Sequence, residues 1–295
     1  MTTRKINSIL ITGCNGLLGK NLCKKLSLLE YDIYGIARNN LFEPIKNVNY
    51  LIQDISNFNS QSDLPKNIDC IIHLAQSSNF RNFPESAGDI FNVNVGSTAF
   101  LLDYARSIGI KKFIFASSGG IYGQGSNSFD ENAEIVSHGD LGFYLGTKTC
   151  GEILVQSYSQ VFQVNIIRPF FIYGFGQNRS MLIPRMMDSI INSRPILIQG
   201  SNGIRINPIH VDDASSALIS LLNYDKSSIF NIAGPEILSM YEISEKMASY
   251  LGKKPIYKKV EGDSSDIIAD ISLMKKELHV PQKTISQSME DIVGI

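Results

Sequence analysis

The stretch ITGCNGLLG, residues 11–19, decides the fold. Its three glycines, spaced three residues apart, lie between an apolar run (8–12) and a segment with leucines at helical spacing (16–30). A side chain at such a strand-to-helix turn would block the pyrophosphate of a dinucleotide, whereas a helix N-terminus offers free N–H groups. The stretch therefore predicts a dinucleotide-binding turn, although the same glycines would also suit tight packing of helix on strand.

The pattern around this turn is that of a parallel sheet flanked by helices. Short β-branched runs alternate with helical segments through the first 120 residues, and the pattern loosens after residue 175. The predicted strands cover residues 8–12, 32–38, 48–54, 70–76, 111–117, 164–174, 195–200 and 228–234. The predicted helices cover residues 16–30, 90–109, 142–160, 183–193, the segment following Asp212, and 240–252.

We therefore predict an α/β protein: a doubly wound parallel (Rossmann) sheet with a smaller C-terminal α/β substrate lobe. Residues 1–175 are expected to form the dinucleotide-binding domain, with residues 206–234 returning to it. Residues 176–205 and 235–295 are expected to form the small lobe.

The amino-acid composition limits the classes of partner that we expect this chain to bind. The 27 Lys and Arg residues nearly balance the 28 Asp and Glu residues, so the net charge of −1 predicts no nucleic-acid partner. The four cysteines are scattered, which favours a reduced, cytoplasmic compartment and no metal site. No charge-free run approaches the ~20 apolar residues of a membrane span, and the N-terminus lacks a signal-peptide pattern. We expect no membrane partner.

The end of the second predicted strand bears on the choice of cofactor. It reads Ala37-Arg38-Asn39, without the carboxylate that would hold the adenosine ribose hydroxyls. We therefore expect NADP, with Arg38 on the 2′-phosphate. NAD remains the alternative cofactor, because Arg38 would then stack on adenine or face solvent. Asp54 would accept from the adenine amino group, or serve as an ordinary turn residue.

A tyrosine and a lysine stand one helical turn apart. Tyr144 and Lys148 in YLGTK are spaced i and i+4, so both project from one face of the predicted helix. A nearby ammonium favours the phenolate, so we expect the tyrosine pKa to fall towards neutrality. Tyr144 is thus the predicted proton-transfer residue.

Together these residues resemble a known family. The motifs are the 11–19 turn, HLA (73–75), NVNVGST (92–98), ASSGGIYG (116–123), the Tyr144/Lys148 pair with Glu152, RPFFIYG (168–174) and HVDDA (210–214). In this order they are similar to the extended short-chain dehydrogenase/reductases, the NAD-dependent epimerase/dehydratase family that modifies nucleotide sugars. The resemblance runs from about residue 8 to about residue 235, and residues 238–253 extend it.

The resemblance implies roles for individual residues. Tyr144 would be the acid/base, Lys148 would bind the nicotinamide ribose, and Ser118 would hydrogen-bond the reacting oxygen. Asn94 is expected to tie the backbone of the site. The expected cofactor-binding residues are Gly13, Asn15, Gly16, Leu17, Leu18, Gly19, Arg38, Asp54, Ile55, Leu74, Ala75, Asn94, Tyr144, Lys148 and Phe171. The expected substrate-binding residues are Ser118, Gly119, Tyr144, Phe171, Arg179, Gln199 and Arg205.

Two positions depart from the family pattern. Phe171 stands where the family often has an asparagine near the substrate. Ile206 stands where the family usually has an arginine that grips the nucleotide diphosphate. Arg205 or Arg179 is expected to contact phosphate instead, unless both are surface residues.

The residues after Ser118 narrow the reaction. Sugar 4,6-dehydratases carry acids there, whereas this chain has Gly119 and Gly120, so dehydration is disfavoured. We expect reduction of a keto group, C4 by preference, on a nucleotide-linked sugar, with a nucleotide-sugar 4-epimerase as the alternative. A catalytically silent dinucleotide-binding regulatory protein is a third hypothesis. The resemblance also implies a homodimer packed through the helices around 91–107 and 143–160.

Overall fold

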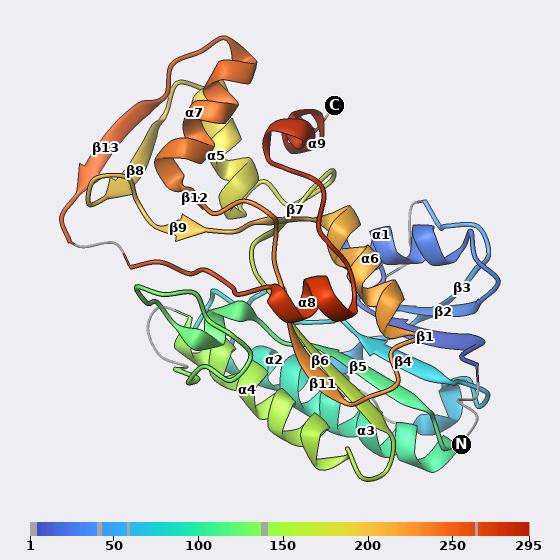
Figure 1. The fold of residues 1–295 in the computed structure, drawn as a ribbon. Coiled ribbons are helices and arrows are strands. Elements are labelled where there is room, and N and C mark those ends of the chain that lie inside the picture. The colour runs from blue at the N-terminus through green and yellow to red at the C-terminus, as the bar shows by residue number, and fades with distance from the viewer. Residues whose placement is uncertain (1–4, 40–42, 58–59, 137–140, 263–264, 295) are drawn as a thin grey trace.

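The larger lobe is built on a parallel sheet in the order β11-β6-β5-β4-β1-β2-β3 (Figure 1). The computed structural model describes residues 5–39, 43–57, 60–136, 141–262 and 265–294. The strands of this sheet are β1 (Ser8–Thr12), β2 (Asp32–Ala37), β3 (Val48–Ile52), β4 (Cys70–His73), β5 (Lys112–Ala116), β6 (Gln163–Pro169) and β11 (Ser228–Ile232). All adjacent pairs are parallel. The predicted doubly wound Rossmann sheet is confirmed.

Helices cover both faces of this sheet (Figure 1). Helices α1 (Leu17–Leu26), α6 (Val211–Leu221) and α8 (Ser272–Glu277) lie on one face, and α3 (Ser97–Ile108) and α4 (Gly142–Ser157) lie on the other. A short helix α2 (Ala87–Phe91) and a π-helical turn η3 (Asn92–Gly96) lead directly into α3. The strand order reverses at β1, which lies between β2 and β4, and ligands of such sheets bind at the carboxyl ends of the strands there.

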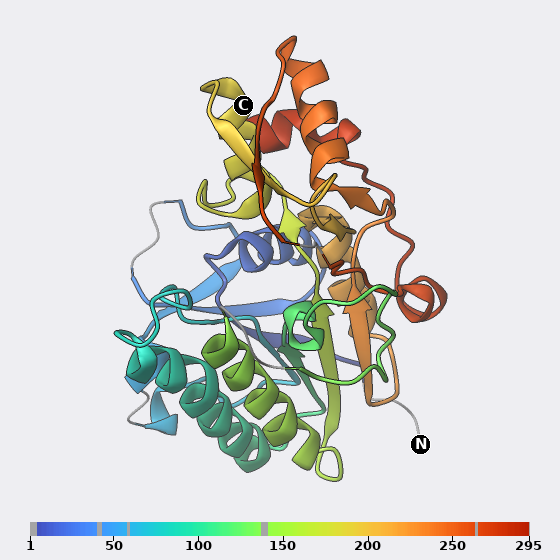
Figure 2. The same ribbon diagram turned by 90° about the vertical axis from the view of Figure 1, so that its left-hand side faces the viewer.

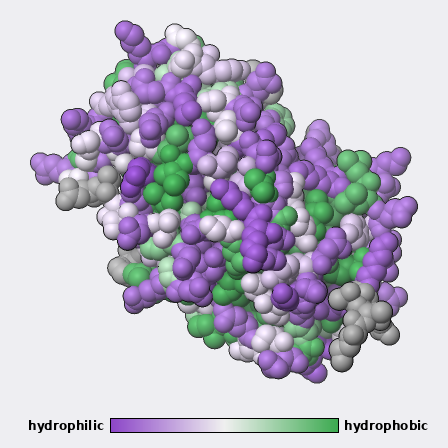
Figure 3. Space-filling model, viewed as in Figure 1, coloured by the Kyte–Doolittle hydropathy of each residue, from purple (hydrophilic) through white to green (hydrophobic). Residues whose placement is uncertain are grey.

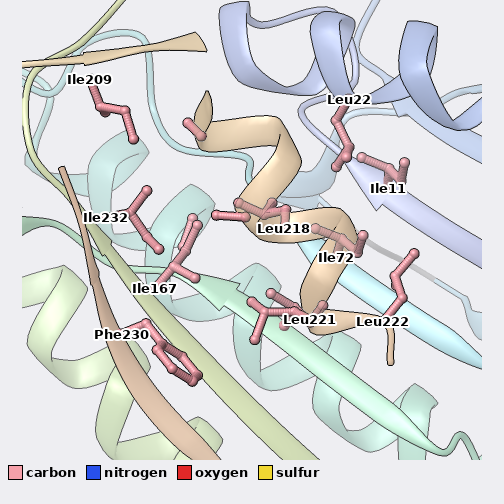
Figure 4. Close-up of a cluster of buried hydrophobic side chains, with 14 of the residues drawn as sticks. Ile11, Leu22, Ile72, Ile167, Ile209, Leu218, Leu221, Leu222, Phe230 and Ile232 are labelled. Atoms are coloured by element: carbon pink, nitrogen blue, oxygen red, sulfur yellow. The ribbon is translucent and has the colours of Figure 1, made fainter. Parts of the chain in front are cut away.

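The core forms because each sheet face is apolar. Ile11 and Ile72 from the sheet meet Leu22 of α1 and Leu218 of α6, all fully buried (Figure 4). A second cluster fills the opposite face, between the sheet and α3 and α4. Continuous β-branched and aromatic strands are what a sheet buried on both faces requires.

A smaller lobe lies above the carboxyl ends of the strands (Figures 1 and 2). Its elements are α5 (Leu182–Ile191), β8 (Pro195–Gln199), β9 (Arg205–Ile206), β12 (Leu238–Ser239), α7 (Met240–Leu251), β13 (Ile256–Val260) and α9 (Met289–Val293). They share a third apolar cluster. The pair β7 (Ile172–Tyr173) and β10 (Ile209–His210) joins the lobes, and 3₁₀ turns occupy Ile55–Asn57, Gln61–Asp63, Gly119–Tyr122 and Ser286–Ser288.

Two segments differ from the expected element bounds. The strand expected over 164–174 is interrupted, because Phe171 adopts a positive φ of 45° and β6 ends at Pro169. Ile271 and Met274, expected in the small lobe, pack into the core cluster of the main sheet. The chain from 265 onwards therefore passes from one lobe to the other before it returns to α9 (Figure 1).

The face of the molecule in Figure 3 is mainly hydrophilic, with hydrophobic side chains in small separate groups. Among the described residues, no helix has both the length and the apolar character that a bilayer span requires. The described residues also contain no cluster of three or more His, Cys, Asp or Glu side chains that could hold a metal ion.

Lys112 is a charged residue inside the main lobe. Its side chain is 3% exposed, and its ammonium donates to the carbonyl oxygens of Leu221, Leu222 (3.1 Å) and Tyr224 (2.6 Å). A cation at a helix C-terminus satisfies carbonyls that lack partners within the helix. Lys112 thus fastens the end of α6 to β5.

We predict that Lys112→Met lowers the free energy of unfolding by about 2 to 4 kcal/mol, because buried carbonyls lose their donor. Urea denaturation followed by circular dichroism measures the change. Lys276→Met, at a side chain that is 77% exposed, is the matched control and should shift stability by less than about 0.5 kcal/mol. Equal stabilities of the two variants would contradict this role for Lys112.

Candidate active site

The turn after β1 leaves no room for side chains. Gly13 has a φ of +69°, and a Cβ placed on it would lie 2.9 Å from the backbone nitrogen of Ala75. A Cβ on Gly19 would lie 2.1 Å from the carbonyl oxygen of Gly13. Helix α1 begins at Leu17, and no described side chain caps its N-terminus. This close backbone approach at a helix N-terminus fits the phosphates of a dinucleotide.

A cleft with a volume of about 1340 Å³ opens above this turn. Its walls come from the first strand-to-helix turn, the ends of β2 and β3, the segment after β4, the end of β5, the start of α4 and the loops before α5. Among the expected site residues, those that line it are Gly13, Asn15, Gly16, Leu17, Leu18, Gly19, Arg38, Asp54, Ile55, Leu74, Ala75, Ser118, Tyr144 and Phe171.

Arg38 and Asp54 lie together at the end of the cleft beside β2 and β3. Asp54 accepts from the backbone nitrogen (2.9 Å) and the hydroxyl (2.8 Å) of Ser56. These hydrogen bonds, helped by the positive charge of Arg38, hold the pKa of Asp54 below its usual value. The Asp54 carboxylate and the exposed Arg38 guanidinium thus both lie where they could contact the adenosine part of a dinucleotide.

Ser118, Tyr144 and Lys148 meet where β5 ends against α4. Ser118 follows β5 and accepts from the backbone nitrogen of Gly120 (3.1 Å). The Lys148 ammonium donates to the carbonyl oxygen of Ala116 (2.8 Å), which ties α4 to the same strand end. The Tyr144 hydroxyl donates to Oε1 of Gln76 (2.8 Å), on the segment after β4. Lys148 is 1% exposed and lies behind the cleft lining.

Burial dominates the electrostatics of this pair. It raises the pKa of Tyr144 above its usual value, and the hydrogen bond with Ser118 only partly opposes it. Burial lowers the pKa of Lys148 to about 7, against the attraction of Glu152. The expected fall in the tyrosine pKa is therefore wrong for this geometry. The ammonium lies 5.9 Å from the centre of the Tyr144 ring and directs its hydrogen bond to Ala116.

Gly119 and Gly120 are enclosed by apolar side chains. A Cβ on Gly119 would lie 2.4 Å from the ring of Phe170, which is buried and stacks near Tyr122. A Cβ on Gly120 would lie 3.0 Å from the Leu145 side chain. A Cβ at position 119 would thus collide with a buried ring, whereas one at position 120 would press only on the end of the Leu145 side chain. With glycine at both positions, the site has no carboxylate there.

Comparison with known proteins agrees with this geometry. The sequence model of the NAD-dependent epimerase/dehydratase family matches residues 9–233. The chain belongs to that family. It is therefore an enzyme of the extended short-chain dehydrogenase/reductase type, and the expected family is confirmed.

Several relatives of the family align over most of the chain. An uncharacterized UDP-glucose epimerase, YtcB of Bacillus subtilis, is 27% identical and the match covers 94% of this chain and 93% of the relative. A UDP-glucuronate 4-epimerase of Thermodesulfobacterium geofontis is 27% identical, covering 87% and 82%. A dTDP-4-dehydro-6-deoxy-D-allose reductase of Streptomyces bikiniensis is 24% identical, covering 83% and 82%. The crystal structure of UDP-glucuronic acid 4-epimerase from Bacillus cereus with NAD superposes with a TM-score of 0.85 at 24% identity, covering 96% of both chains.

Three residues expected to bind substrate are not part of the cleft lining. Arg179 pairs with Asp188 and donates to the carbonyl oxygen of Ile292 (2.7 Å). Arg205 is held by Asp266, at 2.9 Å from its Nε. Gln199 lies on β8. None of these three residues lines the cleft.

Two further expected residues are buried behind the lining. Asn94 accepts from the backbone nitrogen of Ser77 (2.9 Å) and donates to the Thr147 hydroxyl (2.9 Å), so it joins the segment after β4 to α4. Gly119 lies beneath Phe170.

The segment after β4 supplies lining residues that sequence reasoning missed: Gln76, Ser77, Ser78, Phe80 and Arg81. A signal was available, since they directly follow the HLA motif at the carboxyl end of a predicted strand. Phe80 packs on Tyr144 with ring centres 5.1 Å apart, so this segment forms a wall around the tyrosine.

We predict that Gly19→Ala abolishes detectable NAD binding and lowers the melting temperature, because its Cβ would collide with the backbone of Gly13. Gly96→Ala is the matched control: Gly96 lies in a helical segment, and a Cβ there would meet no atom within 4 Å beyond its own stretch of backbone, so stability and binding should be preserved. Differential scanning fluorimetry and a titration with NADH test both. Normal binding by Gly19→Ala would refute the assignment of the turn.

Proposed function

We propose that this protein is a nucleotide-sugar 4-epimerase that oxidises and re-reduces C4 of a UDP-linked hexose with NAD. The observation that carries the proposal is a cleft in which Tyr144 lies beside Ser118 and glycines, in place of acids, occupy positions 119 and 120. Such a site suits hydride transfer at one carbon and removes the means for proton transfers at C5 and C6.

The relatives support epimerisation over net reduction. YtcB, a UDP-glucuronate 4-epimerase and a putative UDP-glucose 4-epimerase of Methanocaldococcus jannaschii each share 27% identity with the chain. The last of these matches over 97% of both chains. Two dTDP-4-dehydro-6-deoxy-D-allose reductases, at 24% and 25% identity, each match over 83% of the chain.

The chain's own residues would act as follows. Tyr144 would accept the proton of the hydroxyl on C4 while the hydrogen bonded to C4 itself leaves as hydride. It would return a proton to the oxygen when hydride is added to the opposite face of the keto sugar. Ser118 hydrogen-bonds the same oxygen. The dinucleotide, when bound, supplies the hydride acceptor. The residues proposed to hold it are those of the 13–19 turn, Arg38, Asp54, Ile55, Leu74, Ala75, Phe171 and Lys148, with Asn94 supporting the site from behind.

Lys148 and Gln76 position Tyr144 in the proposed mechanism. Lys148, whose pKa burial lowers to about 7, lies 5.9 Å from the centre of the Tyr144 ring and ties α4 to the end of β5 through its hydrogen bond to Ala116. Gln76 accepts from the tyrosine hydroxyl and so holds it in the cleft.

A second candidate is an NADPH-dependent keto-sugar reductase. Arg38 favours it, because an exposed arginine lines the cleft at the end of β2, where a 2′-phosphate would bind. Both candidates use the same three catalytic residues and differ in whether the cofactor leaves after each turnover.

The homodimer and the cytoplasmic location stay predictions. Phe91 and Ile153 lie on the two expected dimer helices and are 49% and 61% exposed, which suits a helix-packed interface.

We predict that Tyr144→Phe lowers kcat by about 10²- to 10⁴-fold, because it removes the proton-transfer group, and leaves NAD affinity unchanged. Interconversion of UDP-glucose and UDP-galactose, and of UDP-glucuronate and UDP-galacturonate, measured by chromatography, tests this. Full activity of the variant would remove Tyr144 from the mechanism.

The sugar interconversion assay and an assay of NADPH oxidation together separate the two candidate functions. The epimerase interconverts the sugars without consuming cofactor. Steady loss of NADPH absorbance at 340 nm with a 4-keto-6-deoxy nucleotide sugar, together with no interconversion, would establish the reductase instead.

A further inference from the structure

Charge is sparse in the cleft. Among the described lining residues, the charged ones are Arg38, Asp54 and Arg81. Arg38 and Asp54 lie at the ends of β2 and β3, whereas Arg81 lies on the segment after β4, next to Phe80 and Tyr144. The half of the cleft where the sugar would react thus has one described charged side chain on its wall.

Arg81 is held in place without being neutralised. Its guanidinium carbon lies 4.9 Å from the centre of the Phe80 ring, and Phe80 in turn packs on Tyr144. Its Nη2 contacts Sδ of Met181 at 3.8 Å, across the cleft. No described carboxylate forms an ion pair with it. A cation stacked on an aromatic ring keeps its hydrogen-bond donors free for a ligand.

The other arginines expected to contact substrate are engaged elsewhere. Arg205 is bound by Asp266 and Arg179 by Asp188, and neither lines the cleft. Arg81 also lies beside the start of α5, because Met181 directly precedes that helix and lines the cleft. The partial positive charge of a helix N-terminus adds to the attraction for an anion at the same place.

We propose that Arg81 anchors the substrate by binding an oxyanion of the nucleotide-linked sugar, either its diphosphate or a carboxylate on the hexose. The planar guanidinium presents paired donors that match phosphate and carboxylate oxygens. Because Phe80 joins Arg81 to Tyr144, an anion held there fixes the sugar relative to the tyrosine. The proposal rests on the proposed function, since it takes a nucleotide sugar as the ligand.

The test is calorimetric titration of the NAD-loaded protein with UDP, UDP-glucose and UDP-glucuronate. We expect Arg81→Met to weaken binding by about 10- to 100-fold, as loss of a charged hydrogen-bond partner does, and Arg81→Lys to restore part of the affinity. Arg185→Met is the matched control: Arg185 lies on α5, is exposed and does not line the cleft, so its loss should leave all three affinities unchanged.

The pattern over the three ligands identifies the anion. Weaker binding of all three, UDP included, assigns Arg81 to the diphosphate, and weaker binding of UDP-glucuronate alone assigns it to a hexose carboxylate. Unchanged binding by Arg81→Met, or an equal loss in Arg185→Met, would overturn the proposal and leave the proposed function standing. A wild-type protein that binds none of the three would instead overturn the proposed function, and this inference with it.

Discussion

A buried guanidinium, that of Arg168 on β6, holds together the elements that carry the site. It forms a two-pronged ion pair with Glu152 of α4, at 2.9 and 2.7 Å, and both side chains are almost fully buried. It also donates to the hydroxyl of Tyr122 (2.6 Å), which donates to Asn231 of β11 (2.8 Å). Removing one partner would leave an uncompensated buried charge, so the pair fixes α4 on the sheet. The helix that carries Tyr144 and Lys148 is positioned by this constraint.

The chemistry then follows from what can approach Tyr144. On one side the strand end after β5 presents Ser118, followed by two glycines whose space is filled by Phe170 and Leu145. On the other side the segment after β4 places Gln76 and Phe80 against the tyrosine. In the proposed function, Tyr144 is the single group that moves a proton, and its apolar and amide surroundings suit oxidation and reduction at one carbon. The small lobe lies above the carboxyl ends of the strands (Figures 1 and 2), and Met181, Leu182 and Ile183 at the start of α5 line the cleft.

The sheet, its flanking helices and the glycine turn were predictable because each depends on local patterns: apolar runs, helical spacing and residues without side chains at a turn. The ion pairs that Arg179 and Arg205 form could not be predicted, because their carboxylate partners become neighbours only in the folded chain. Asp266, for example, is 61 residues from Arg205 in the sequence. The direction of the Tyr144 pKa failed for a related reason. Sequence spacing places an ammonium near the ring, but burial, which only the packed structure shows, has the larger effect. The break at Phe171 depends on a positive φ that residue type alone does not predict.

The central claim is that the site moves a hydride at one carbon and exchanges protons only on oxygen. Its most direct test is to incubate the protein with NAD and UDP-glucose or UDP-glucuronate in D₂O and to analyse the product by NMR and mass spectrometry. The account predicts a sugar inverted at C4 with no deuterium on any ring carbon, because the hydrogen that leaves C4 returns to it. Deuterium at C5 would show proton transfer at carbon and would contradict the account.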